Sequence, residues 1–205
     1  MKTEYEKARA GYLFRQGDPR LAKERERAQE LCFLYNQTNP SDKERRQEIL
    51  RQLLPNAKGS VTINAPFYCD YGTQITTGER FFANYNCKIV DGGEIVFGDD
   101  VRIAPDCSFL TITHALDPQM RRDNYAVYLP VRVGNNVWFG TGVKVLPGVT
   151  IGDDSVIAAG SVVTRDIPSG VLAAGVPCRV VRKLNEADKN RYPRYEEEIQ
   201  HPAAE

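Results

Sequence analysis

The 205-residue sequence contains two histidines, the side chains best suited to accept a proton near neutral pH. His201 stands beside Pro202 near the end of the sequence, where we expect a solvated tail. His114 stands in the segment TITHALDP, at a point where a regular pattern of the sequence breaks. A lone histidine is more often a surface or core residue than a catalyst. The place of His114 at the start of an irregular segment nevertheless favours a role as general base.

The pattern that breaks near His114 is a repeat of six residues. Aliphatic or aromatic residues keep one phase on both sides of the break: Phe97, Ile103, Phe109, Val133, Phe139, Val145, Ile151, Ile157 and Val163. Slender residues follow four positions later: Val101, Cys107, Val137, Val143, Val149, Ser155 and Ser161. This repeat predicts a parallel β-helix with three short faces in each coil. The alternative is a β-sandwich, whose strands repeat less strictly.

Small residues directly after the apolar positions mark the expected corners of the coils. Gly98, Gly134, Gly140 and Gly152 occupy this place, and we expect them to supply the positive φ that tight corners require. Asn or Asp follows at many corners, and these residues also tolerate the left-handed conformation.

The repeat divides the sequence into three parts. Residues 1–57 lack it and predict a helical cap over the open end of the solenoid. Residues 58–184 predict the β-helix, interrupted by an excursion at 111–130, where function tends to reside. Residues 185–205 predict a charged tail that frays or forms a short helix.

Three helices are expected in the cap, over about 3–15, 19–36 and 41–54. Ser41 and Glu44 form a candidate capping box for the third helix, which Pro55 ends. The second helix has apolar residues at helical spacing, which predict its buried face: Leu21, Ala28, Leu31, Cys32 and Tyr35.

Composition argues against several classes of protein. Lys plus Arg equals Asp plus Glu, so nothing favours a nucleic acid or an anionic membrane as partner. The sequence has no apolar run of about 18 residues, and the N-terminal MKTEYEKARAGYLF is too charged for a signal peptide. The five cysteines are scattered without a C-x-x-C motif, which predicts reduced and mostly buried thiols. We therefore expect a cytoplasmic protein.

Three blocks of the sequence are distinctive: GNNVW at 134–138, PGVTIGD at 147–153 and AGVPCR at 174–179. With the loop histidine in TITHALDP, they resemble the hexapeptide-repeat O-acetyltransferases, specifically the maltose, galactoside and nodulation-factor acetyltransferase group. The N-terminal EKARAGYLF and the later YCDYGTQI and FFANYNCKIVDGG are also similar to that group. The resemblance covers about residues 4–185.

The resemblance implies a left-handed parallel β-helix, a handedness that periodicity alone does not supply. It implies a homotrimer with active sites between adjacent subunits. It implies transfer of an acetyl group from acetyl-CoA, as co-substrate, to a hydroxyl of a sugar of the maltose, glucose or galactoside type, by direct attack in a ternary complex. No metal is expected to take part.

The resemblance also implies roles for individual residues. His114 matches the family's general base, and Asn84 matches a residue that holds the reacting groups. Acceptor contacts are implied for Arg25, Asp70 and Asp91. Contacts with acetyl-CoA are implied for Gly140, Thr141, Ala159, Thr164, Arg165, Arg179 and Arg182. Arginine forks fit phosphate oxygens, and backbone N–H groups at Gly140 and Thr141 are candidate donors to an oxyanion.

Plainer explanations stay open for these residues. Gly140 and Asn84 can simply turn corners, and each arginine can be a solvated surface charge. The chain departs from the galactoside branch at Gln16 and Gly92, where that branch has acidic residues, so the acceptor stays open. Alternatives are transfer to a non-sugar hydroxyl or amine, such as an antibiotic, and a non-catalytic trimeric scaffold. A carbonic anhydrase of this fold needs three histidines to hold zinc and is excluded.

Overall fold

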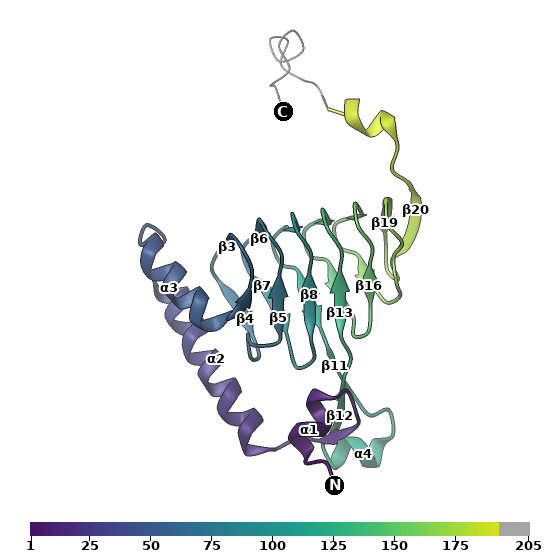
Figure 1. Ribbon diagram of the computed structural model, residues 1–205. Helices are drawn as coiled ribbons and strands as arrows, with labels where there is room; N and C mark the ends of the chain where they lie inside the picture. The colour runs from purple at the N-terminus through teal and green to yellow at the C-terminus, as the bar shows by residue number, and fades with distance from the viewer. Residues whose placement is uncertain (193–205) are drawn as a thin grey trace.

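Three parallel sheets form the sides of a prism, and the chain visits them in turn (Figure 1). The computed structural model describes residues 1–192. We name each sheet after its strand in the second coil. The β5 sheet contains β2 (Asn56–Ala57), β5 (Ile75–Thr77), β8 (Ile95–Phe97), β13 (Val131–Val133) and β16 (Thr150–Ile151).

The other two sheets complete the coils. The β6 sheet contains β3 (Val61–Ile63), β6 (Phe81–Ala83), β9 (Arg102–Ile103), β14 (Trp138–Phe139), β17 (Val156–Ile157), β19 (Val171–Ala174) and β20 (Arg179–Lys183). The β7 sheet contains β4 (Phe67–Cys69), β7 (Cys87–Val90), β10 (Ser108–Leu110), β15 (Lys144–Val145) and β18 (Val162–Val163). Neighbouring strands of these sheets are parallel, except that β20 returns antiparallel to β19. The predicted β-solenoid, of about six coils with an N-terminal helical cap, is confirmed.

The core of the prism is a continuous apolar stack. Every residue of the two predicted inward sets is buried, with at most 4% of its surface exposed. Four phenylalanines, Phe81, Phe97, Phe109 and Phe139, follow one another along the axis with ring centroids 5.0 Å apart. The six-residue repeat thus sets both the strands and the core, because each face contributes its inward side chains to the same narrow interior.

The corners differ from the prediction in one respect. The positive φ angles fall on the Asp or Asn two residues further on, at 58° for Asp100, 52° for Asn136 and 55° for Asp154. Gly98 is not among the residues with positive φ. It is required by crowding, because a Cβ there would lie 2.5 Å from the Asn135 side-chain oxygen and 2.7 Å from the backbone of the next coil. Close stacking of coils, rather than backbone conformation, selects glycine at this position.

The cap contains α1 (Glu4–Arg9), α2 (Pro19–Gln37) and α3 (Lys43–Leu53). The expected helix over 3–15 is wrong beyond Arg9: Gly11 has φ of +72°, and Phe14–Arg15 forms the short strand β1. The N-cap of α3 is Asp42, whose carboxylate accepts from the Arg45 N–H at 3.1 Å, rather than Ser41. The predicted buried face of α2 is confirmed for all five residues.

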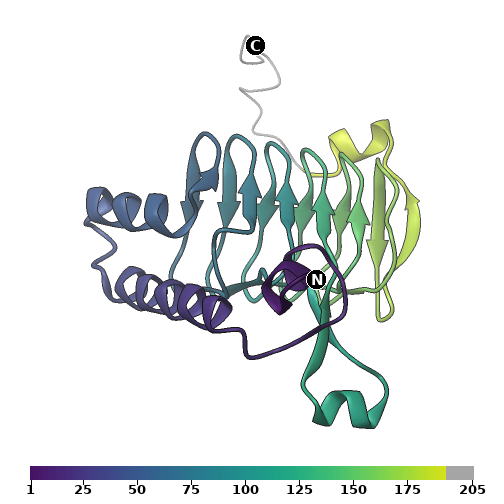
Figure 2. The same ribbon diagram turned by 60° about the horizontal axis from the view of Figure 1, so that its bottom comes forward.

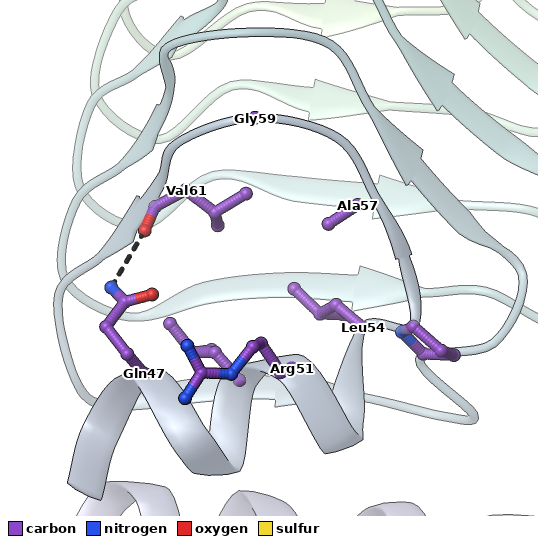
Figure 3. Close-up of a pocket in the computed structure, with 8 residues that line it drawn as sticks. Gln47, Arg51, Leu54, Ala57, Gly59 and Val61 are labelled. Atoms are coloured by element: carbon purple, nitrogen blue, oxygen red, sulfur yellow. Dashed lines mark hydrogen bonds between the residues drawn. The ribbon is translucent and has the colours of Figure 1, made fainter. Parts of the chain in front are cut away.

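The second and third helices lie across the first coil of the prism (Figures 1 and 2). Figure 3 shows α3 beside this coil, where the Gln47 side chain donates to the Val61 carbonyl at 3.1 Å. Leu50, Leu54 and Val61 line a cavity of about 340 Å³ between helix and coil. The cap therefore shields the apolar end of the stack that an open solenoid would leave in water.

The excursion at 111–130 is an ordered hairpin. It consists of β11 (Ile112–His114), α4 (Pro118–Arg122) and β12 (Tyr125–Tyr128), and it projects away from the coils in both views (Figures 1 and 2). The N-terminal β1 pairs antiparallel with β12, so the sheet order is β1-β12-β11. We call this sheet, together with α1, the hairpin clamp. Its own apolar cluster contains Ala8, Phe14, Leu21, Tyr71, Ala126 and Tyr128.

The tail is described only in part. After β20 the chain forms a 3₁₀ helix, η1 (Glu186–Asn190). Residues 193–205 of the expected tail, His201 among them, lie outside the described residues. Within residues 1–192, no helix combines the length and the apolar character needed to cross a membrane.

Candidate active site

One corner of the prism collects the turns between the β6 and β7 sheets. In each turn, one backbone N–H donates a hydrogen bond to a carbonyl of the next coil, which stacks the turns on one another. The donors, one from each successive coil, are Asn64, Asn84, Ala104, Gly140 and Ala158. We call this line the Asn84 edge. Thr141 and Ala159 directly follow two of these positions and are exposed. Four residues predicted to bind ligand, Asn84, Gly140, Thr141 and Ala159, therefore stand on one edge although up to 75 positions separate them in the sequence.

Asn84 is fixed by hydrogen bonds to its side-chain oxygen. Its Oδ1 accepts from Asn64 Nδ2 at 3.1 Å and from the Tyr85 backbone N–H at 2.8 Å. Its Nδ2 donates to no group within residues 1–192. Asn84 therefore turns a corner, as the plainer explanation expects, and also presents a held amide donor at the partly exposed edge.

Backbone donors continue along this edge. The N–H groups of Thr141 and Ala159 have no acceptor among the described residues. The N–H of Gly140 donates to the Ile157 carbonyl at 2.8 Å, and Gly140 is buried. A Cβ at Gly140 would lie 2.5 Å from the Ala159 nitrogen, so this glycine serves the close packing of coils. The candidate oxyanion donor of the predicted pair is therefore Thr141, and the prediction of a ligand contact at Gly140 finds no support in this geometry.

The far end of the Asn84 edge carries cations. The turn between β19 and β20 packs against the segment that follows Ala159, since Gly175 N donates to Ser161 Oγ at 3.1 Å and Cys178 N donates to the Val162 carbonyl at 2.8 Å. Arg179 is exposed at the start of β20. Arg182 is held by Asp188 of η1 through two hydrogen bonds of 2.8 and 2.5 Å, and this pairing holds the pKa of Asp188 far below its usual range. From Asn84, after β6, to Arg179, on β20, the edge spans five strand spacings, roughly 24 Å, which suits an extended ligand with an anionic end.

A second corner of the prism collects the turns between the β7 and β5 sheets. It contains the turn after β4 with Asp70, the turn after β7 with Asp91, the hairpin with His114, and the turn after β18 with Thr164 and Arg165. We call this line the His114 edge. His114 ends β11, pairs with Ala126 of β12, and is exposed. The hairpin clamp fixes the strands on which this imidazole stands.

Arg25 of α2 enters this corner beneath the hairpin. Its Nη2 donates to Tyr71 Oη at 2.8 Å, and Tyr71 Oη lies 3.1 Å from Tyr128 Oη. Asp70 is partly exposed, and its carboxylate accepts no hydrogen bond within residues 1–192. Burial raises the pKa of Asp70, and Arg25 opposes that rise. Asp70 is therefore an unoccupied acceptor beside a cation, which suits contact with a hydroxyl.

Asp91 does not share this arrangement. It is fully buried, and Oδ1 accepts from the Asp70 and Tyr71 backbone N–H groups at 2.9 and 2.8 Å. Its Oδ2 accepts from the Gln74 N–H at 3.2 Å. Burial raises the pKa of Asp91 to about 7 against the effect of these bonds. The predicted contact of Asp91 with an acceptor finds no support here, because both oxygens of the buried carboxylate already accept from backbone N–H groups of the Asp70–Gln74 turn.

Gly92 lies in this corner in contact with Tyr128 and Arg9. A Cβ at Gly92 would overlap the ring of Tyr128, so the tyrosine fills the space that any side chain at 92 would need. The Gly92 carbonyl accepts from Arg9 Nη1 at 3.0 Å, and Arg9 is also paired with Glu24. At Gly92, where we expect a departure from the galactoside branch, the ring of Tyr128 therefore occupies the space.

The two edges border the same face, the β7 sheet, but lie on opposite sides of it. A face of about six residues separates them by roughly 15–20 Å. The predicted base and acceptor contacts lie on the His114 edge, and Asn84 lies on the other. The predicted coenzyme contacts are divided, with Thr141, Ala159 and Arg179 on the Asn84 edge and Thr164 and Arg165 on the His114 edge. Within one chain the residues form two half-sites.

Sequence reasoning missed several residues that shape these half-sites. Tyr71 and Tyr128 carry the hydroxyl pair beside Arg25, and Asn64 orients Asn84. Asn64 had a signal, since it precedes Asn84 by 20 positions, about one coil. Tyr71 follows Asp70 directly, but its contact with the hairpin is long-range and leaves no local pattern. Within residues 1–192, no three or more His, Cys, Asp or Glu side chains are grouped so that they could hold a metal ion.

Comparisons with known proteins agree with this architecture. Residues 7–58 match the family described as "Maltose acetyltransferase hexapeptide capping motif", and residues 130–165 match "Bacterial transferase hexapeptide (six repeats)". The galactoside O-acetyltransferase of Escherichia coli K12 is 41% identical over 91% of this chain and 92% of its own length.

Two solved structures are also similar. A maltose O-acetyltransferase from Clostridium difficile 630 superimposes with a TM-score of 0.87 and 44% identity, covering 90% of this chain and 99% of that one. A galactoside acetyltransferase in complex with coenzyme A superimposes with a TM-score of 0.90 and 39% identity, covering 95% and 97%.

Proposed function

Since the chain belongs to the hexapeptide-repeat acetyltransferases of the maltose and galactoside group, we propose that it transfers the acetyl group of acetyl-CoA to a hydroxyl of a sugar. Relatives named for maltose and galactoside acceptors, and one solved with coenzyme A, support the substrate classes. The observation that carries the proposal is the Asn84 edge, where a held amide, two backbone N–H groups without an acceptor among residues 1–192 and a terminal arginine stand in line.

The proposed reaction needs one base and no covalent enzyme intermediate. His114 takes the proton of the sugar hydroxyl as its oxygen attacks the thioester carbonyl carbon. The amide of Asn84 and the N–H of Thr141 are the donors available to the oxygen of the tetrahedral intermediate. The C–S bond then breaks, and the proton on His114 passes to the thiolate, which leaves acetylated sugar and free coenzyme A.

The division into two half-sites supports a homotrimer whose active sites form between subunits. The His114 edge of one chain would face the Asn84 edge of the next. The outer surface of the β6 sheet supports this packing: Phe82, Trp138, Val156 and Leu172 follow one row, interrupted only by Arg102, and Trp138 is 50% exposed. The corresponding row on the β7 sheet runs from Tyr68 through Lys88, Ser108 and Lys144 to Val162, so its centre is polar. An apolar face of this kind suits a subunit contact.

Replacement of His114 tests the chemistry. The variant His114→Ala should keep the fold and the affinity for coenzyme A but lose about 10²–10⁴ in kcat, the usual contribution of a positioned base. The assay mixes acetyl-CoA with a panel of sugars and detects the free thiol. His201→Ala is the matched control and should retain activity. An unchanged kcat in His114→Ala would show that another group is the base.

Mixing two inactive variants tests the shared site. His114→Ala and Asn84→Ala chains, co-expressed in equal amounts, assemble at random into trimers. If each site uses His114 of one chain and Asn84 of its neighbour, about a quarter of the sites contain both intact residues. Activity should therefore return to about a quarter of the wild-type value. No recovery in mixed trimers would place both residues of a site on one chain.

A further inference from the structure

A second cavity opens between the cap and the first coil, beside the Asn84 edge. Its volume is about 450 Å³, within the range of sites for small molecules. Its polar lining includes Tyr35, Lys43, Arg46, Thr62 and Asn64. Gln47, which also lines the first cavity (Figure 3), borders it on the side of α3.

Two cations face this cavity, and no carboxylate is among its lining residues. Arg46 is preoriented: its Nη2 donates to Tyr35 Oη at 2.9 Å, and its guanidinium lies 4.5 Å from the centroid of the Tyr35 ring. The other nitrogens of Arg46, Nε and Nη1, donate to no group within residues 1–192. The Lys43 side chain is exposed and has no hydrogen bond or ion pair within the same range. The neighbouring Arg45, in contrast, pairs with Glu48 at 2.6 Å.

The N-terminal end of α3 adds little to this positive field. Lys43 is the first residue of α3, an 11-residue helix, so the positive end of the helix dipole lies at the cavity. The Asp42 carboxylate caps the same helix end by accepting from the Arg45 N–H, so its negative charge offsets the dipole there. Lys43 and Arg46, which have no carboxylate partner within residues 1–192, therefore favour an anion in this cavity.

The cavity continues the line of the Asn84 edge. Asn64 lines the cavity and donates to Asn84 at 3.1 Å, so one side chain separates the cavity from the proposed reaction centre. Thr141, Ala159 and Arg179 lie on the other side of Asn84, two or more coils away. A coenzyme that follows those residues leaves the cavity free for the second substrate.

We propose that this cavity receives the distal part of the acceptor and selects a sugar that carries an anionic group, a phosphate or a carboxylate. The proposal rests on the acetyl transfer proposed above and deepens it, since it names the class of acceptor. Lys43 and Arg46 bind the anionic group, and Asn64 links this subsite to Asn84. A hydroxyl of the same sugar is then held at the reaction centre by the contacts of the neighbouring His114 edge.

The experiment compares glucose with glucose 6-phosphate and glucuronic acid as acceptors for the full chain. We expect KM for the two anionic sugars to be lower than for glucose by about tenfold or more, as one charge-assisted contact provides. Lys43→Gln should remove most of this advantage. Arg45→Gln, one helix position from Arg46 and paired with Glu48, is the matched control and should leave the advantage intact. Raising the salt concentration should weaken the advantage, because exposed Lys43 is screened.

Calorimetric titration of glucose 6-phosphate separates this proposal from the reaction. If no sugar is acetylated but glucose 6-phosphate binds and Lys43→Gln weakens it by about tenfold, the subsite stands and the acetyl transfer fails. If glucose is acetylated and anionic sugars show no advantage, the subsite is wrong and the transfer stands. An advantage that survives in Lys43→Gln and in Arg46→Gln would also overturn the proposal, because it would place the anion elsewhere.

Discussion

The coils and the hairpin clamp bury aromatic residues in different ways. In the coils, four phenylalanine rings at 5.0 Å spacing belong to one stack in which each coil contacts only the next. In the clamp, Phe14 packs on Tyr128 at 4.7 Å within a small apolar cluster that polar contacts border: Arg25 with Tyr71, and Arg9 with Glu24 and the Gly92 carbonyl. Those partners are spread over residues 9 to 128, so the clamp depends on long-range contacts.

This difference indicates that the coils provide a rigid scaffold, whereas the hairpin clamp positions the proposed base. The coils form from a six-residue pattern that repeats locally along the sequence. They provide a stiff edge along which Asn84 and the predicted coenzyme contacts are spaced by the distance between coils. The clamp positions a single hairpin, with His114 at the end of one strand. A hairpin of two short strands is marginal alone, so β1 and α1 supply the surface against which it folds. The N-terminal segment is therefore part of the catalytic machinery that we propose as well as a cap.

The largest effect is expected for Phe109→Ala in the coil stack. Phe109 is fully buried, with rings on both sides at 5.0 Å, and truncation leaves a cavity that the stiff coils cannot close. We expect a loss of about 3–5 kcal/mol in the free energy of unfolding. Denaturant unfolding followed by circular dichroism measures it. A loss below about 1 kcal/mol would show that neighbouring coils relax into the space.

Phe14→Ala makes the same chemical change in the clamp, and its effect should be local. The coils should stay folded, so the midpoint of thermal unfolding should fall less than for Phe109→Ala. Amide exchange should accelerate in β11 and β12 but not in β14 to β18. Because His114 loses its fixed position, kcat should fall by about 100-fold. Equal acceleration in the coils would show that clamp and coils unfold as one unit.

The same contrast explains what could be predicted from the sequence. The inward positions of the coils follow from a local repeat, and every one of them is buried as expected. The helix expected over 3–15 is wrong beyond Arg9, because Phe14 and Arg15 pair as a strand with a hairpin more than 100 positions away in the sequence. Cys32 and Cys69 lie with sulfurs 3.8 Å apart, a contact that their scattered spacing could not reveal.

The residues of the candidate site also differ in how far the sequence could predict them. Grouping on the Asn84 edge follows from counting coils, so Asn84, Thr141 and Ala159 could be placed together from the repeat alone. The role of Asp91 could not, because a carboxylate that caps a turn and one that binds a sugar look the same in a sequence. Only the three backbone N–H groups around Asp91 distinguish the two.

Gly92→Ala should give an intermediate effect at the base of the clamp. The added methyl group overlaps the Tyr128 ring and must displace it, which we expect to cost about 1–3 kcal/mol of stability. Gly93→Ala is the matched control, since a Cβ there would lie 3.2 Å from the Tyr128 Cβ and needs only a small shift. Thermal unfolding and KM for the acceptor are the measurements. Equal effects for both variants would show that the Tyr128 ring moves freely.

Asp91→Asn should change the stability least at neutral pH, but it should change how stability varies with pH. Burial raises the pKa of Asp91 to about 7 in the folded chain, whereas an unfolded aspartate has a pKa near 4. The stability that protonated Asp91 contributes is therefore complete below about pH 4 and is lost as the pH rises through about 7. Asparagine does not titrate, so the variant lacks this loss.

The amide that Asp91→Asn introduces would keep one oxygen for the Asp70 and Tyr71 N–H groups but turn an NH₂ group toward the Gln74 N–H. That lost bond should cost about 1–3 kcal/mol at pH 4. The deficit should shrink as the pH rises toward 8, where wild type carries a buried charge and the variant does not. Unfolding free energies of both proteins between pH 4 and 8 measure this convergence. A deficit that grows with pH would mean that the three backbone donors stabilise the ionised carboxylate more than burial destabilises it, and Asp91 would then hold the turn before the half-site as an anion.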